Sequence, residues 1–288
     1  MHVLQPHQRL AVIALSAAAP GYLARLMLHP KTPTPPAAPP PLPPAAEPVA
    51  FPSAERALCR GWWVEPQGPA DTCVLLAHGW TSSASRLADW VEPLLGHGHR
   101  VLLYNARGHG NSDPVTICSL RQFTEDLVAA AAYARSRAGG GRLAVIGHSL
   151  GAAATLVALA NGLPLEAAVT LAPPAHPRQA TADLLAGQGL PAEYITDRVG
   201  RHVETLVGWT FDRMAPEVRV SEITSPVLIV HGNEDTVVPV AHFHRIRRQA
   251  PANVELVLVP GADHDTIHEL PEVRRHVLAY LDRVLGSV

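Results

Sequence analysis

Charged residues and cysteines are both scarce in this sequence. Only 17% of its 288 residues are charged and the net charge is -2, whereas globular domains usually contain roughly 25% charged residues. A protein that reads nucleic-acid backbones needs a basic stripe, so this charge balance argues against that class. The cysteines, Cys59, Cys73 and Cys118, are odd in number and widely spaced, which favours free thiols over a disulfide scaffold or a zinc site.

Histidine is abundant, with 16 residues, but its spacing gives no metal-binding pattern. The closest pairs, His97/His99 and His242/His244, are two residues apart, and such pairs point to different faces of a helix. Neither pair has a Cys, Asp or Glu at ligand spacing. We therefore interpret these histidines as solvated polar residues and expect neither a metal nor a cofactor.

The first 29 residues contain no apolar run long enough to span a bilayer. The run at 10–19 is followed by Pro20, whereas a spanning helix needs about 20 apolar residues. We expect residues 1–29 to form a helical segment that docks on the domain or makes peripheral contact with a membrane, which makes the chain cytoplasmic or membrane-associated. The alternative is a secretion signal ending in three alanines, although cleavage before Pro20 would be unfavourable. The apolar side chains at helical spacing after Pro20 are Leu23, Leu26 and Met27.

Proline dominates residues 30–48. Because proline lacks a backbone N–H and cannot continue a helix or a sheet, we expect an extended linker here rather than a proline-recognition ligand. The folded domain is then expected at residues 49–288.

Short apolar runs alternate with helix-like stretches after the linker. The strand-like runs are 57–64, 73–77, 101–104, 143–146, 167–171, 227–230 and 254–259, and the helix-like stretches are 84–95, 120–138, 149–159, 241–249 and 271–285. Continuous apolarity indicates strands that are buried on both faces. The alternation predicts an α/β fold: a mostly parallel, doubly wound sheet of about eight strands with helices on both faces. Ligands of such sheets bind at the carboxyl ends of the strands.

Ser149 is a candidate nucleophile in the sequence Gly147-His148-Ser149-Leu150-Gly151. The motif follows the apolar run at 143–146 and precedes a helix-like stretch of small residues. This context predicts a nucleophile elbow, a sharp strand-to-helix turn in which the glycines give the chain room to fold back. The N-terminus of the helix also favours the negative charge that develops during attack by the hydroxyl.

A serine hydroxyl needs a base and an orienting acid, which in this architecture follow the nucleophile in the order acid, then histidine. Asp235 follows the apolar run at 227–230, and His264 follows the run at 254–259. We predict Asp235 as the acid and His264 as the general base. The rival candidates are Glu234, Asp263 and Asp265 for the acid and His268 for the base.

An oxyanion hole requires two convergent backbone N–H groups. Leu150, directly after the nucleophile, should supply one of them, and the loop Ala77-His78-Gly79-Trp80-Thr81 should supply the other. Because Gly79 lets the backbone turn close to a substrate, we predict the Trp80 N–H as the second donor.

These motifs together resemble the α/β-hydrolase superfamily, in particular its lysophospholipase-like and serine-aminopeptidase-like esterase branch. The resemblance extends from about residue 49 to the C-terminus, and Asn105 departs from the Asp of many relatives. Its carriers are His78-Gly79-Trp80, the turn Arg107-Gly108-His109-Gly110, the Ser149 elbow, Gly232-Asn233-Glu234-Asp235 and Ala262-Asp263-His264. The resemblance implies a small helical cap at residues 173–226 and a structural role for the Arg107 turn.

The expected function is metal-independent hydrolysis of a carboxylic ester, such as a lipid or other acyl ester of a small molecule, through an acyl-serine intermediate. The alternatives are an aminopeptidase or acyltransferase on the same triad, or a non-catalytic binding protein on this scaffold. A dehalogenase or epoxide hydrolase is disfavoured, because those relatives place Asp at the elbow. An aminopeptidase would need an anionic clamp for the substrate amine, with the candidates Asp183, Glu193, Asp197 and Glu204. Apolar cap residues would line an acyl site or join the cap to the body: Leu184, Leu185, Tyr194, Leu206, Trp209, Phe211 and Met214.

Overall fold

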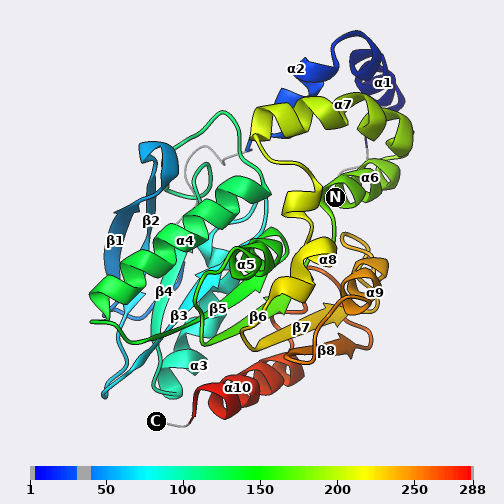
Figure 1. Cartoon of the computed structure of the whole chain (residues 1–288). Helices are drawn as coiled ribbons and strands as arrows, with labels where there is room; N and C mark the ends of the chain where they lie inside the picture. Colours follow the sequence, from blue (N-terminus) through cyan, green and yellow to red (C-terminus); the bar gives the residue numbers. More distant parts are fainter. Residues whose placement is uncertain (1–3, 31–39, 287–288) are drawn as a thin grey trace.

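An eight-stranded sheet forms the centre of the molecule in the computed structural model, which describes residues 4–30 and 40–286 (Figure 1). Its order is β1-β2-β4-β3-β5-β6-β7-β8. The β1–β2 and β2–β4 pairs are antiparallel, and the other pairs are parallel. The mostly parallel, doubly wound sheet predicted from the sequence is confirmed. The strands are β1 (Glu47–Pro52), β2 (Leu58–Val64), β3 (Thr72–Ala77), β4 (Arg100–Asn105), β5 (Arg142–His148), β6 (Ala167–Leu171), β7 (Val227–Gly232) and β8 (Val254–Val259).

Helices cover both faces of the sheet (Figure 1). One face packs against α4 (Leu120–Arg137), α5 (Leu150–Ala160) and α9 (Ala241–Arg247). The other packs against the 3₁₀ helix η2 (Ala84–Trp90), α3 (Val91–Gly96) and α10 (Pro271–Leu285). In β3 the side chains of Leu75 and Leu76 enter the two opposite cores and are both fully buried. This is why the strand is apolar at every position rather than at alternate ones.

The helix expected at 84–95 is divided into η2 and α3. Pro93 has no N–H for an α-helical bond to a residue one turn earlier, so it is tolerated only in the first turn of a helix. A new α-helix therefore begins at Val91, with Pro93 in its first turn.

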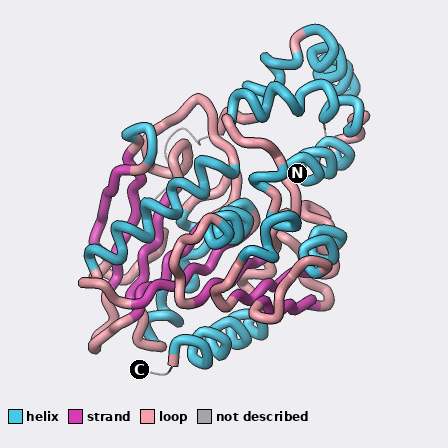
Figure 2. The backbone as a smooth tube through the Cα atoms, viewed as in Figure 1, coloured by secondary structure: helices cyan, strands magenta, loops and turns pink. Residues whose placement is uncertain are grey.

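A cap lies between β6 and β7 and consists of α6 (Pro177–Gly187), α7 (Ala192–Val207) and α8 (Pro216–Arg219). Two N-terminal helices, α1 (Pro6–Ala18) and α2 (Pro20–Met27), pack against α7 on the side away from the sheet (Figures 1 and 2). The apolar contact joins Leu23 and Ala24 of α2 to Ile195 and Val199 of α7. Short 3₁₀ turns complete the fold: η1 (Ala54–Arg56), η3 (Asp212–Met214) and η4 (Val220–Glu222).

The segment expected as a linker at 30–48 falls partly outside the described residues, at 31–39. Within the described ranges, no helix combines the length and the apolarity that a membrane crossing requires.

The three cysteines are buried as free thiols in the body of the molecule. Cys59 lies on β2, Cys73 on β3, and Cys118 just before α4. Burial raises the pKa of all three thiols, that of Cys73 to about 12. These cysteines are therefore neutral packing residues.

Candidate active site

Ser149 sits on the tight turn between β5 and α5, with a φ of 54°. A positive φ is uncommon for a residue with a side chain and marks local strain. The turn is held in place by a hydrogen bond from the Ser149 N–H to the Leu171 carbonyl, 2.9 Å long. A β-carbon at Gly151 would lie 2.2 Å from the Ala77 carbonyl oxygen, so only glycine allows the elbow to cross the end of β3 this closely.

The structure brings Ser149, His264 and Asp235 together in one chain of hydrogen bonds. The Ser149 hydroxyl lies 3.0 Å from His264 Nε2, and His264 Nδ1 lies 2.7 Å from Asp235 Oδ2. The other carboxylate oxygen of Asp235 accepts the N–H groups of Val237 and Val238 at 2.9 and 2.7 Å. Both oxygens of this buried carboxylate are thus engaged, which fixes its orientation toward the imidazole.

The rival acids and base have other partners. Glu234 is exposed, and one Asp263 oxygen accepts backbone N–H groups of its own turn. Asp265 pairs with Arg86 at 3.3 Å. His268 is buried beside the ring of His148, at 5.4 Å between centroids. Within the described chain, none of the four contacts the Ser149 hydroxyl or the ring of His264.

Both predicted oxyanion donors belong to backbone next to the serine. Leu150 is the first residue of α5, and the first amides of a helix have no acceptor within the helix. A β-carbon at Gly79 would lie 2.9 Å from the Ser149 β-carbon. The backbone at Gly79 therefore passes directly against the candidate nucleophile, which leaves the adjacent Trp80 N–H as the predicted second donor.

Buried histidines support the loops around the site, a feature that the sequence analysis missed. His78 Nε2 accepts the Ala106 N–H at 3.0 Å while its Nδ1 donates to the Gly79 carbonyl at 2.8 Å. His109 Nε2 accepts the Thr81 N–H at 3.3 Å. These bonds need neutral rings, and burial lowers the pKa of both, that of His78 to about 3. They anchor the loop that carries the predicted Trp80 donor.

Two further buried histidines act in the same way on the loops of the acid and the base. His148 Nε2 donates to the His264 carbonyl at 2.9 Å, and His231 Nε2 donates to the Val238 carbonyl at 2.8 Å. Burial lowers the pKa of each ring. The signal available in the sequence was the position of these residues, since each stands at the carboxyl end of a strand.

The interpretation of the close histidine pairs as solvated residues is wrong for His99 and His242, which are both buried. His242 joins the body to the cap, because its Nδ1 accepts the Ala175 N–H at 2.9 Å and its Nε2 contacts Asp183 of α6 at 2.8 Å. Burial lowers the pKa of His242. Among the described residues there is no group of three or more His, Cys, Asp or Glu that could hold a metal ion.

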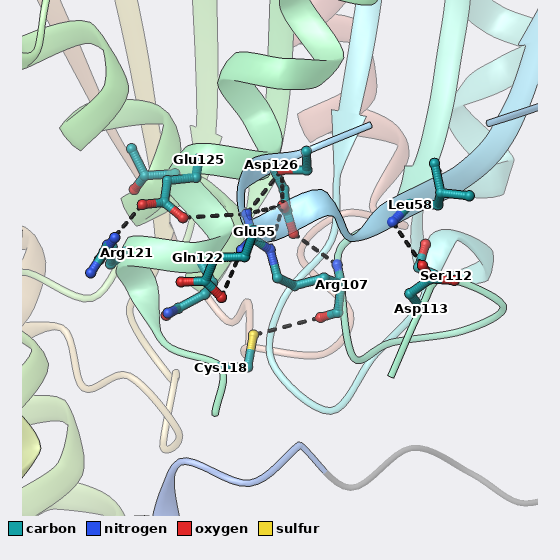
Figure 3. Close-up of polar contacts among 12 residues, drawn as sticks. Glu55, Leu58, Arg107, Ser112, Asp113, Cys118, Arg121, Gln122, Glu125 and Asp126 are labelled. Carbon is teal, nitrogen blue, oxygen red and sulfur yellow. Dashed lines mark hydrogen bonds and ion pairs between the residues drawn. The ribbon is translucent and has the colours of Figure 1, made fainter. Parts of the chain in front are cut away.

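The Arg107 turn is anchored by a buried ion pair (Figure 3). Arg107 is fully buried, and its Nε donates to Asp126 Oδ1 at 2.7 Å. The second oxygen of Asp126 accepts the Arg107 backbone N–H at 2.8 Å. Glu125 lies 3.3 Å from the same guanidinium. These bonds tie the turn to α4 and to Ser53, which agrees with the structural role that the resemblance implies for this turn.

Asn105 also has a structural role. Its Oδ1 accepts the Ala84 N–H at 2.7 Å, while its Nδ2 donates to Asn111 Oδ1 at 2.8 Å. An ionised Asp offers only acceptors, whereas the amide of Asn105 serves one partner as acceptor and the other as donor.

An apolar cluster adjoins the elbow, and a separate cavity lies beyond the Trp80 loop. An apolar cluster behind the elbow includes Ala153, Ala154 and Phe123, and the half-buried side chains of Trp80 and Leu150 pack against it. A cavity of about 360 Å³ begins at Thr81, next to Trp80, and extends to His268. Its lining residues do not include Ser149, Asp235 or His264: they are Thr81, Ser82, Ser83, Ser85, Arg86, Asp89, Gly110, His268 and Glu269.

Comparisons with known proteins agree with this geometry at the level of the family. The family model described as serine aminopeptidase, S33, matches residues 68–221, more than half of the chain. A monoacylglycerol lipase of Mycolicibacterium smegmatis is 27% identical over 230 residues, which cover 68% of this chain and 82% of that protein. A non-heme chloroperoxidase of Streptomyces lividans is 27% identical over 253 residues, which cover 72% and 90%.

Solved structures agree on the fold. An esterase of Pyrococcus furiosus aligns with a TM-score of 0.66 and 22% identity, covering 84% of this chain and 91% of that chain. The esterase Est1E of Butyrivibrio proteoclasticus, solved with ferulic acid, aligns with a TM-score of 0.64 and 19% identity, covering 83% and 99%. With its sheet, its cap and its match to the family model, the chain belongs to the serine aminopeptidase S33 family of the α/β-hydrolase superfamily.

Proposed function

We propose that this hydrolase is a serine esterase that cleaves a carboxylic ester through an acyl-Ser149 intermediate. The observation that carries the proposal is the continuous chain of hydrogen bonds from Ser149 through His264 to Asp235, with contacts of 3.0 and 2.7 Å. Serine is a weak nucleophile without a base within hydrogen-bond reach. A buried and doubly fixed acid is what keeps the base in the tautomer that can accept the serine proton.

The reaction has two half-steps. In the first, Ser149 Oγ attacks the ester carbonyl as His264 Nε2 takes its proton, and the N–H groups of Leu150 and Trp80 bind the oxyanion. The tetrahedral intermediate then collapses, the C–O bond to the alcohol breaks, and His264 returns the proton to the leaving alkoxide. In the second, water attacks the acyl-serine with the same proton transfers and releases the acid. Asp235 holds the ring through its contact with Nδ1 and stabilises the imidazolium.

The apolar side chains beside the elbow favour an ester with an apolar acid. The side chains of Trp80 and Leu150 offer an acyl chain a surface to bury. Similarity to a monoacylglycerol lipase and to esterases supports the same substrate class.

An aminopeptidase is the second candidate, favoured by the description of the matching family. Its amine clamp would require an unengaged carboxylate in the cap. However, Asp183 contacts His242, Asp197 and Glu193 pair with Arg178, and Glu204 accepts the Phe211 N–H. All four candidate acids therefore already have partners within the protein, which supports the esterase over the peptidase.

Hydrolysis of p-nitrophenyl butyrate tests the proposal, with a peptide p-nitroanilide as the parallel substrate. Ser149→Ala should lower kcat by on the order of 10⁶-fold, as comparable triad removal does. Ser136→Ala, which changes an exposed serine on α4, serves as the matched control. Equal rates in wild type and Ser149→Ala would overturn the mechanism, and preferential cleavage of the anilide would favour the peptidase.

Peripheral membrane contact through the N-terminal helices is part of this proposal. Leu10, Tyr22 and Leu26 are 67%, 58% and 48% exposed on α1 and α2. The first acidic residue of the chain is Glu47, so this surface carries no negative charge that anionic lipids would repel. Co-sedimentation with phosphatidylglycerol vesicles should retain the wild type and lose Leu10→Asp/Leu26→Asp, and equal retention of both would contradict it.

A further inference from the structure

The end of α2 connects the cap to the body beside the candidate active site. The helix packs against α7 of the cap through Leu23 and Ala24. Directly after it, the Leu28 carbonyl accepts the Cys118 N–H at 2.8 Å, and His29 Nδ1 lies 3.2 Å from the Thr116 carbonyl. The helix before Leu28 is thus held by the cap, and the backbone at Leu28 is held by the body.

Pro30 extends this anchor by one more contact. Its ring packs so closely against Gly108 that a β-carbon on the glycine would lie 2.7 Å from Pro30 Cγ. Gly108 belongs to the turn that the buried Arg107–Asp126 pair holds in place. The residues that follow α2 therefore pack against a turn that a buried ion pair holds in place.

The side chain of Leu28 packs against the apolar cluster behind the nucleophile elbow. The same cluster carries the half-buried side chains of Trp80 and Leu150, the two predicted oxyanion residues. Val203 of α7 packs against both this cluster and the cluster that joins α2 to the cap. Side chains of the elbow, the cap and the N-terminal segment thus pack on the surface of one apolar cluster.

We propose that Leu28 is a specificity-determining residue that closes the far end of the acyl side of the site and limits the length of the acyl chain. The inference rests on the proposed function, since it concerns the ester that Ser149 would cleave. An acyl chain that leaves Ser149 along this surface gains buried area with each methylene until it meets a side chain that cannot move. Leu28 is such a side chain, because its backbone is hydrogen-bonded to the body and the preceding helix α2 packs on the cap.

Chain-length profiles of p-nitrophenyl esters from acetate to laurate test this inference in the full chain. Burial of one methylene changes a binding constant about fourfold. Leu28→Ala, which opens room for about two methylenes, should therefore raise kcat/KM for long esters relative to butyrate by about 15-fold. Leu28→Trp should shift the optimum toward shorter esters. Arg25→Ala is the matched control, because Arg25 is an exposed residue of the neighbouring helix α2.

A second series separates this inference from the proposed function. The rate at which alkyl fluorophosphonates of increasing chain length label Ser149 reports the acyl side without requiring turnover. Because lengths are compared within one variant, partial loss of folded protein lowers all rates equally and leaves the profile unchanged. Identical profiles in wild type, Leu28→Ala and Leu28→Trp would overturn the role of Leu28 while leaving the esterase intact. A wild type that neither reacts with the probes nor cleaves any ester would overturn both.

Discussion

The carboxyl edge of the sheet and the cap side of the molecule are held together by different means. At the sheet edge, Ser149 and Asp235 are fixed by backbone hydrogen bonds, and buried neutral histidines anchor the neighbouring loops. Besides the buried apolar packing of Val207 and Met214, the cap is tied to the body by polar side chains nearer the surface. These ties are Arg121 to the Val207 carbonyl, Asp183 to His242, and Glu217 to Arg245.

The difference separates the chemistry from the choice of substrate. Backbone bonds between neighbouring strands cannot be altered by exchanging one side chain, so at the sheet edge the exchangeable supports are mainly the buried histidines. The surfaces that would contact an acyl chain belong largely to the cap and to the segment after α2, where single side chains make the ties. Specificity can therefore change in this architecture without disturbance of the triad.

The largest effect should follow from removing the acid at the sheet edge. Asp235→Asn keeps the shape of the side chain but favours the wrong imidazole tautomer, and kcat should fall by about 10⁴-fold, as such a change does in related triads. Glu234→Gln changes the exposed neighbour and should leave kcat within about twofold. Steady-state hydrolysis of p-nitrophenyl butyrate measures both. A larger loss in Glu234→Gln would transfer the role of the acid to Glu234.

Loss of the buried ion pair beneath the Arg107 turn should have the next largest effect. Arg107→Met leaves the Asp126 carboxylate buried without its cation, and breaking such a pair costs about 3–5 kcal/mol. The free energy of unfolding, measured in urea, should fall by that amount. The double variant Arg107→Met/Asp126→Leu should recover most of the loss, and an equal loss in the double variant would contradict this explanation.

Acidification should weaken the sheet edge through its neutral histidines. Burial holds the pKa of His78 at about 3, below the ordinary 6.5. As the pH falls from 6.5 toward 3, the unfolded chain therefore binds a proton that the folded chain does not. Stability should decrease with falling pH by about 1.4 kcal/mol per pH unit for this ring. Urea unfolding between pH 7 and 5 should show this slope reduced in His78→Gln and unchanged in His276→Gln, which alters an exposed histidine; equal slopes in the two variants would exclude His78 as its source.

The smallest effect should come from the surface of the cap. Arg178 on α6 pairs with Asp197 and Glu193 of α7 while remaining 41% exposed, and exposed ion pairs contribute about 0–1 kcal/mol. Arg178→Met should therefore change the free energy of unfolding by less than about 1 kcal/mol. A loss as large as that of Arg107→Met would mean that the cap and the body are stabilised alike, and the contrast between the two regions would fail.

The sheet was predictable from the sequence because burial on both faces leaves a continuous apolar run, as at 73–77 and 227–230. The proximity of Ser149, Asp235 and His264 was predictable for a related reason. Parallel strands place their carboxyl ends at one edge, so residues that follow three different strands converge there. Strand topology brings these distant residues together, and the topology can be recognised from local sequence patterns.

Other features were not accessible in this way. A histidine such as His78 reads as polar whether it is solvated or buried, since only its partners, here Ala106 and Gly79, decide its state. The contact between α2 and α7 joins segments about 170 residues apart, with no common pattern to pair them. The position of Leu28 against the elbow cluster depends on that contact, so it could not be predicted from the sequence either.

The buried cysteines have a practical consequence for studying this contrast. All three lie in the body, and burial keeps their thiols protonated. Reagents that attack thiolates can therefore react with these cysteines only after the body unfolds. The native cysteines are thus internal reporters of body unfolding, while a cysteine introduced on the exposed surface of α7 would carry a dye for following the cap alone.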